Sequence, residues 1–208
     1  MKKLIAIFFT SLFFMSTAYA GGMVGIKVGF GELHGERTSS GESGATSGSV
    51  DSEYGAIFAE ANLADTPVSL GIELVPMEGV IDTKNDANSA DTEVTVSNLI
   101  TAYVLAEKET DFGSIYGKLG YATVDLEAKS GYGLALSNAS KEADGPMVGI
   151  GAQFEVPTPI INTVRLEATH TMFGEVKLST TDGDGGGTAD RTGEADLTTF
   201  SISLARSF

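Results

Sequence analysis

Six charged residues lie at inward positions of segments that are otherwise apolar or built from small residues. They are Lys27, Glu60, Glu73, Lys118, Arg165 and Glu167. Three cations and three anions in a narrow protein interior should pair and hydrogen-bond, because an unpaired buried charge is strongly destabilising. The balanced set therefore predicts an internal ion-pair network. The alternative is that these charges line a narrow path for ions or small solutes.

Catalytic chemistry has few candidate residues. The chain contains no cysteine and two histidines, His34 and His170. A hydrolytic site needs a nucleophile, a base and an orienting acid within hydrogen-bonding reach. Glu36, Ser39 and Ser40 are near His34 in sequence, but no motif marks a triad, and His170 is expected on an outer face. We expect no enzyme activity, and an enzyme would be favoured only if His34 lay beside a serine and an acid.

Acidic residues are concentrated in four polar segments, 34–52, 82–91, 127–145 and 180–196, which are expected to be long exposed loops. Divalent cations prefer such oxygen ligands. The run Asp182-Gly183-Asp184 falls short of the spacing of a calcium-binding EF-hand loop. We therefore expect no specific metal site and no cofactor.

Apolar residues alternate with small or polar residues in eight segments, and this period of two predicts strands. The segments are 22–33, 53–62, 68–77, 94–106, 115–125, 147–156, 163–173 and 197–208. Long polar segments and short turns connect them alternately, with turns at 65–67, 108–113 and 157–159. An even number of strands with long loops at one end and short turns at the other is typical of bacterial outer-membrane barrels.

The phase of two strands is ambiguous. In 53–62 the pattern places Ile57 outward and Phe58 and Glu60 inward, but the part near Tyr54 fits either phase. In 94–106 we expect Val94, Val96, Ile100, Ala102 and Val104 outward and Ser97, Thr101 and Tyr103 inward, although Asn98 and Leu99 interrupt the alternation. A slip of one residue would exchange the two faces.

Aromatic residues are expected to form girdles at the two membrane interfaces. The loop-end set is Phe30, Tyr54, Tyr121, Phe173 and Phe200, and the turn-end set is Tyr103, Tyr116, Phe154 and Phe208.

The N-terminus has the features of a secretory signal. Lys2 and Lys3 precede an apolar run at 4–14, and small residues follow up to Ala20. This pattern predicts a signal peptide at 1–20 with cleavage between Ala20 and Gly21, since the apolar run is shorter than the roughly 20 residues of a spanning helix. One domain at 21–208 remains. Loss of two lysines would take the net charge from −15 to −17, and such acidity argues against nucleic-acid binding.

The last strand places Thr198, Phe200, Ile202, Leu204, Arg206 and Phe208 on one face. A chain that ends on such an aromatic residue resembles the C-terminal assembly signal of outer-membrane barrels. With Lys118-Leu119-Gly120-Tyr121 and Val164-Arg165-Leu166-Glu167, the sequence resembles the small eight-stranded barrels of the OmpA transmembrane-domain and OmpX-like kind from Gly22 to Phe208. The resemblance implies interior salt bridges that occlude the lumen.

We therefore predict an all-β protein, an eight-stranded antiparallel up-and-down transmembrane β-barrel in the bacterial outer membrane. Its expected partners are outer-membrane lipid and the outer-membrane assembly machinery, and we expect a monomer. The predicted role is structural, with acidic extracellular loops for surface interactions with a ligand that the sequence does not identify. The alternative function is a narrow ion or solute pore. The alternative architecture is a soluble periplasmic sandwich, in which a second sheet would cover the apolar outer face.

Overall fold

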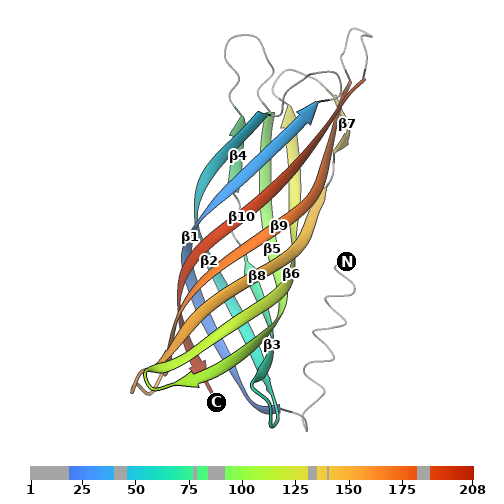
Figure 1. The fold of residues 1–208 in the computed structure, drawn as a ribbon. Helices are drawn as coiled ribbons and strands as arrows, with labels where there is room; N and C mark the ends of the chain where they lie inside the picture. Colours follow the sequence, from blue (N-terminus) through green and yellow to red (C-terminus); the bar gives the residue numbers. More distant parts are fainter. Residues whose placement is uncertain are drawn as a thin grey trace.

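The computed structural model describes residues 19–39, 46–76, 79–83, 92–130, 135–139, 141–181 and 188–208. They form a single antiparallel sheet that closes into a tall barrel with strongly tilted strands (Figure 1). The strands are β1 (Tyr19–Ser39), β2 (Thr46–Leu63), β3 (Val68–Val75), β4 (Gly79–Thr83), β5 (Thr92–Thr110), β6 (Gly113–Ser130), β7 (Ala135–Ala139), β8 (Glu142–Glu155), β9 (Thr163–Thr181) and β10 (Thr188–Ser207). The described residues contain no helix long and apolar enough to cross a membrane.

These ten segments occupy eight positions around the barrel. β3 and β4 follow each other along the same edge of β5, and β7 pairs with the part of β9 beyond its ladder with β8. β10 pairs with both β9 and β1, so the first and last strands are joined. The predicted eight-stranded antiparallel barrel is confirmed, and the alternative of a two-sheet sandwich is wrong.

Tight turns and the C-terminus lie together at one end of the barrel (Figure 1). After β2 the chain turns at Asp65, which has a φ of 58°, and the Thr66 hydroxyl donates to the Leu63 carbonyl over 3.1 Å. Gly22 and Phe208 exchange backbone hydrogen bonds of 2.9 and 3.0 Å. Closure therefore leaves Phe208 fixed in the ladder rather than trailing from it.

The strands extend well into the segments predicted to be long loops. β1 and β2 remain paired through Thr46 opposite Arg37, β6 reaches Ser130, and β10 begins at Thr188, so the expected loops at 34–52, 127–145 and 180–196 are wrong in extent. Of 82–91, only Asp82 and Thr83 fall within β4, and 84–91 lie outside the described residues. Backbone pairing continues there because it does not depend on apolar side chains. The alternation disappears because a strand surrounded by water has no lipid-facing side.

An apolar band surrounds the outside of the barrel. Its exposed members are Val24, Ile26, Val28, Phe30, Ile57, Val104, Ile115, Leu119, Tyr121, Val148, Ile150, Leu166, Met172, Phe200, Ile202 and Leu204. At the loop end of the band Phe30 stacks on Phe200 with ring centroids 5.7 Å apart. Spanning a bilayer takes about 9–11 tilted residues, whereas β1 contains 21. The barrel therefore continues past its apolar band by several residue pairs.

A β-bulge in β5 changes the side to which its upper residues point. Asn98 has a φ of 53°, and the β5–β6 register skips between Ser97 and Ile100. Below the bulge Thr101 and Tyr103 face inward as predicted. Above it Val96 packs against the inner residues Val124 and Phe173, so the predicted outward Val96 and inward Ser97 are wrong. The extra residue of a bulge reverses the alternation. The side chain of Val94 lies outside those described.

The ambiguous strand 53–62 has the phase that places Phe58 and Glu60 inside, since both are buried while Ile57 is 53% exposed. Four of the residues assigned to interface girdles also lie inside the barrel. Tyr103, Tyr116 and Phe173 are buried, and Tyr54 lies beside inward Gly29. The girdle prediction failed for them because distance along a strand does not determine the side to which a residue points.

Candidate functional site

The barrel interior brings the six predicted charged residues together. Lys27 projects from β1, Glu60 from β2, Glu73 from β3, Lys118 from β6, and Arg165 and Glu167 from β9. Five of them have exposed fractions of 7% or less, and the Glu73 side chain is 12% exposed. Two groups of contacts account for all six residues.

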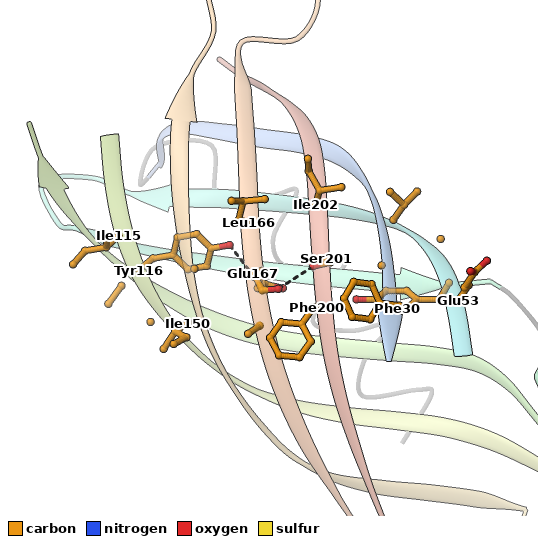
Figure 2. Close-up of a pocket in the computed structure, with 18 of the residues that line it drawn as sticks. Phe30, Glu53, Ile115, Tyr116, Ile150, Leu166, Glu167, Phe200, Ser201 and Ile202 are labelled. Carbon is orange, nitrogen blue, oxygen red and sulfur yellow. Dashed lines mark hydrogen bonds between the residues drawn. The ribbon is translucent and has the colours of Figure 1, made fainter. Parts of the chain in front are cut away.

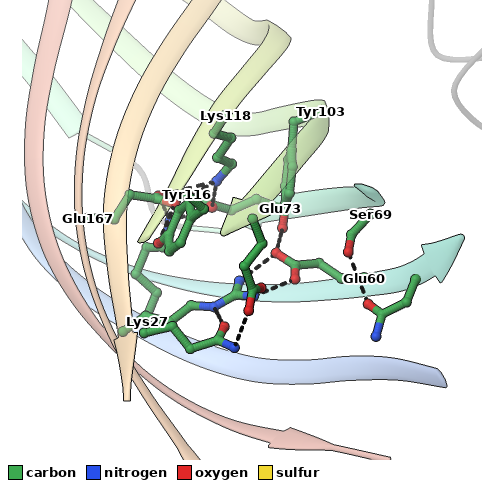
Figure 3. A network of polar contacts seen from close by, with 12 residues as sticks. Lys27, Glu60, Ser69, Glu73, Tyr103, Tyr116, Lys118 and Glu167 are labelled. Carbon is green, nitrogen blue, oxygen red and sulfur yellow. Dashed lines mark hydrogen bonds and ion pairs between the residues drawn. The ribbon is translucent and has the colours of Figure 1, made fainter. Parts of the chain in front are cut away.

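The first group contains two lysines and two glutamates (Figure 3). Lys27 Nζ lies 2.5 Å from Glu73 Oε2 and 2.5 Å from Glu167 Oε1. Lys118 Nζ lies 3.1 Å from the same Glu73 oxygen and 3.2 Å from the same Glu167 oxygen. Each carboxylate is therefore shared between two ammonium groups. Burial of the four charges is compensated by this alternating arrangement rather than by solvent.

The second group is built around Arg165. Its guanidinium donates from Nη1 and Nη2 to the two carboxylate oxygens of Glu60, over 2.6 and 2.7 Å. Nε donates to Gln153 Oε1 over 2.7 Å. The guanidinium also lies 5.1 Å from the centre of the Tyr116 ring. Bidentate pairing of this kind holds a planar cation in one orientation. Arg165 therefore forms a rigid side-chain link across the lumen from β9 to β2.

Two rows of glutamate, glycine and tyrosine connect the groups. The register aligns Glu60, Gly71 and Tyr103 on β2, β3 and β5, and the Tyr103 hydroxyl donates to Glu60 over 2.8 Å. The second row aligns Tyr116, Gly151 and Glu167 on β6, β8 and β9, with a hydroxyl bond of 3.1 Å. In both rows the tyrosine reaches across the glycine to the carboxylate two strands away.

Only glycine fits at the middle position of each row, because a tyrosine ring packs directly against it. A methyl group at Gly71 would lie 2.3 Å from the Tyr103 ring, and one at Gly151 would lie 2.3 Å from the Tyr116 ring. Lys118 Nζ also lies 3.8 Å from the centre of the Tyr103 ring, so this tyrosine contacts both groups of charges. The tyrosines fill the lumen between the ion pairs and supply hydrogen-bond donors to the carboxylates.

The sequence prediction named the six charges but did not include Tyr116 and Gly151 in the network. The inward position of Tyr116 follows from its spacing to Lys118, two residues along β6, and that signal was available. The rows themselves depend on the register between strands, which no single segment encodes.

The alternative of a catalytic His34 can be examined from the register. His34 is opposite Asp196 on β10 and Ser49 on β2, so a histidine, an acid and a serine do occupy adjacent strands. No hydrogen bond joins these three within the described structure, and His34 and Ser49 are exposed. Together they form a solvated row on the convex outer face and lack the contacts that activate a nucleophile.

Metal and terminal sites can also be located. The described residues contain no group of three or more histidine, aspartate or glutamate side chains that could hold a metal ion. Asp182-Gly183-Asp184 lies outside the described residues. Ala20 and Gly21, the expected cleavage site, fall within the first residues of β1, while 1–18 lie outside the described part. Phe208 faces outward and is 74% exposed.

The large hollow shown in Figure 2 lies mainly on the outer wall. Phe30, Ile150, Leu166, Phe200 and Ile202 all contribute to it, and all belong to the outward apolar band. A surface of this kind is the one that lipid chains cover in a transmembrane barrel, so we do not regard it as a separate ligand site.

Neither a protein-family model nor a curated protein matches the sequence. Among solved structures, the chain is similar to the attachment invasion locus protein Ail of Yersinia pestis, with 11% identity and a TM-score of 0.42 over 89% of this chain and 99% of that one. It is also similar to Neisserial surface protein A, with 15% identity and a TM-score of 0.41 over 86% and 96%. The outer-membrane protease OmpT of Escherichia coli has 11% identity and a TM-score of 0.44 over 90% and 97%.

Proposed function

We propose that the protein is a monomeric, non-catalytic outer-membrane barrel whose lumen is closed by a salt-bridged plug and whose acidic outer end presents a surface for interaction. The observation that carries the plug is the complete pairing of Lys27, Lys118 and Arg165 with buried carboxylates. An eight-stranded barrel is just wide enough for side chains to fill its interior. Closing the lumen would leave the barrel as a stable support for its outer end.

Export and assembly are part of the same proposal. Residues 1–20 would be removed between Ala20 and Gly21, and Phe208 would serve as the signal read by the assembly machinery. The pairing of Phe208 with Gly22 supports this role, because the terminal residue lies where the first and last strands close. Deletion of Phe208 should reduce the amount of assembled barrel in the outer membrane without altering export.

The surface role is supported by the chemistry of the outer end. Beyond Phe30, the outward residues of β1 include Glu32 and Glu36, and Asp51 and Asp196 lie on the neighbouring strands. These carboxylates favour partners with a basic surface. Replacement of Glu32, Glu36 and Asp51 by the corresponding amides should reduce adhesion of producing cells to a basic partner without altering the amount of barrel.

Single-channel conductance of the refolded barrel in a planar bilayer tests the plug. We expect no conductance steps from the wild type and fluctuating conductance from Arg165→Ala, because this substitution removes the Arg165–Glu60 link between β9 and β2. Arg206→Ala is the matched control, since Arg206 is exposed and its one side-chain hydrogen bond to a described residue goes to the Pro159 carbonyl at the turn end. Steady conductance from the wild type would overturn the plug.

A narrow pore is the second candidate, and the shared carboxylates favour it. Lys27 and Lys118 contact the same oxygens of Glu73 and Glu167, so an ion could replace one ammonium without leaving either carboxylate unpaired. A cation-selective wild-type current that Glu73→Gln reduces would select the pore over the plug.

A further inference from the structure

The inner wall above the ion-pair network combines an apolar cluster with the threonines Thr169, Thr171 and Thr199. Its inward residues include Val96, Leu99, Val124, Phe173 and Leu197, which pack around buried Ala122. The interior of an outer-membrane barrel is ordinarily polar. Apolar inner residues in a hollow region favour the entry of an apolar group in place of water.

This wall surrounds a real hollow. The cavity has a volume of about 350 Å³, with Glu73, Thr101 and Lys118 at its floor and Leu99, Val124 and Phe173 on its walls. Small-molecule sites are typically mostly apolar cavities of about 300–1,000 Å³ with a few polar groups. The volume and lining therefore suit one apolar chain or one compact ring system.

The cavity also reaches the side of the barrel. Within the described part of the chain, the β2–β3 ladder is seen as far as Ile57 opposite Leu74, and β4 pairs with β5 but not with β2. The five consecutive residues Val50–Tyr54 of β2 all line the cavity. Consecutive residues of a strand point to opposite faces, so the side chains of Asp51 and Glu53 belong to the outward side of β2, at the edge of the cavity.

Exposure of β2 agrees with an open edge. All residues from Ser47 to Glu53 are exposed, including inward Val50 and Ser52. From Gly31 to Glu36, β1 keeps an alternation of less exposed and more exposed residues, because β1 has a partner on both sides. Within the described part of the chain, the opening between β2 and β4 lies beside Val50–Glu53, above Gly55. Ile57, a member of the outward apolar band, follows two residues further along β2.

The charged residues that line the cavity determine which kind of apolar ligand it favours. Asp51 and Glu53 line the mouth at β2, and Glu73 lies at the floor. The one cation that lines the cavity, Lys118, is already shared by Glu73 and Glu167. Glu73 is balanced by Lys27 and Lys118, so the net charge at the cavity comes from Asp51 and Glu53 at the mouth. A carboxylate or phosphate head would be repelled there, whereas a cationic head would be attracted.

We propose that the upper lumen is a binding site for a single-chain cationic amphiphile, whose apolar chain enters through the opening between β2 and β4 and whose head remains at Asp51 and Glu53. This site is distinct from the plug. Whether the ligand arrives from water or from the outer leaflet, the same chemistry is recognised.

The chain contains no tryptophan, so one introduced indole reports on one place. Phe173→Trp places a reporter in the upper lumen, and Phe200→Trp places the control on the outer wall, where Phe200 is 51% exposed. Each variant is reconstituted in phosphatidylcholine nanodiscs and titrated with a dodecyltrimethylammonium probe that carries bromine on its chain. Bromine quenches an indole only at close range.

We expect Phe173→Trp to be quenched saturably at one probe per barrel, and Phe200→Trp to be quenched only in proportion to the probe dissolved in the lipid. Brominated dodecanoate of the same chain length should require an about tenfold higher concentration. Asp51→Asn with Glu53→Gln should remove that preference. Quenching that does not saturate in the lumen variant, or equal binding of the carboxylate, would overturn the proposal.

A blocking variant distinguishes occupancy from a distant effect. Val124→Phe, added to the Phe173→Trp variant, fills the cavity and should weaken binding at least about tenfold. Leu119→Phe on the outward side of the same strand is the control and should bind normally. Leu197→Trp provides a second lumen reporter if Phe173→Trp does not fold, as judged by circular dichroism. Unchanged binding in folded Val124→Phe would place the probe outside the cavity.

A source test completes the design. Probe added from water and probe incorporated in the lipid beforehand should reach the same final quenching. Because the opening lies beside the apolar band, the probe already in the lipid should quench the indole faster. Quenching from water that is at least as fast as quenching from lipid would overturn the side entry.

Discussion

Below Glu73 the lumen is closed by charged and aromatic side chains, whereas above it apolar side chains and threonines line a cavity of about 350 Å³. In the lower lumen Arg165, Glu60 and Tyr103 are held in fixed orientations by hydrogen bonds. In the upper lumen Val124 and Phe173 make only non-directional contacts. The comparison shows that long polar side chains can close a narrow barrel that apolar side chains and threonines leave hollow. We therefore expect substitutions in the lower lumen to affect stability more than substitutions in the upper lumen.

The largest loss of stability is expected from Arg165→Ala. It leaves the Glu60 carboxylate buried without its cation, and breaking a buried pair costs about 3–5 kcal/mol. Urea unfolding in lipid vesicles, followed by circular dichroism, measures the change. Arg206→Ala should change the free energy of unfolding by less than about 0.5 kcal/mol. Equal values for the two variants would mean that the bidentate pair does not stabilise the barrel.

Gly151→Ala should have the next largest effect. The added methyl group would lie 2.3 Å from the Tyr116 ring, and overpacking of this kind costs about 1–3 kcal/mol. Gly117→Ala on the neighbouring strand is the control, because a methyl group there meets nothing within 4 Å. The same urea titration compares the two. If Gly117→Ala were the more destabilising variant, the close approach of Tyr116 to β8 would be wrong.

Tyr103→Phe removes one hydroxyl from the lower lumen and changes little volume. Glu60 keeps Arg165 but loses a donor, which we expect to cost about 1–2 kcal/mol. Tyr121→Phe removes a hydroxyl that donates to Asp144 on the outside of the barrel, where water replaces it. Its effect on the unfolding midpoint should be smaller, and a reversed order would contradict a special role for the interior hydroxyl.

Val124→Ala should have the smallest effect on stability. The side chain borders an existing cavity, so its removal costs about 1 kcal/mol, towards the low end for buried apolar truncations. It should also enlarge the upper lumen and let a cationic probe with a bulkier chain bind. A loss of stability as large as that of Arg165→Ala would remove the distinction between the two regions.

The sequence predicts the lower lumen better than the upper lumen. Strict alternation around Lys27, Lys118 and Arg165 determines which residues face inward once a barrel is assumed. The network also requires equal numbers of buried cations and anions, and these can be counted from the sequence. Its geometry, such as the shared oxygens of Glu73 and Glu167, required the register between distant strands.

The upper lumen was missed for two physical reasons. The bulge at Asn98 reverses the alternation of β5, so Val96 was assigned to the wrong face. The polar segments beyond Leu33 and Leu197 have no lipid-facing side, so their strands carry no apolar pattern to detect. A cavity also depends on the summed volume of side chains from several strands, and no local pattern contains that sum.

The length of the β1–β2 ladder has a consequence for any partner at the outer end. From Phe30, where the apolar band ends, to Ser39 the chain runs about 30 Å along the strand at about 3.4 Å per residue. Because these residues pair with β10 as far as Ser39 and with β2 as far as Arg37, they form a stiff support rather than a flexible tether. A partner that binds there loses little affinity to the ordering of that support. The same stiffness holds the contact away from the bilayer, which favours partners that reach the cell from outside over those already lying on the membrane.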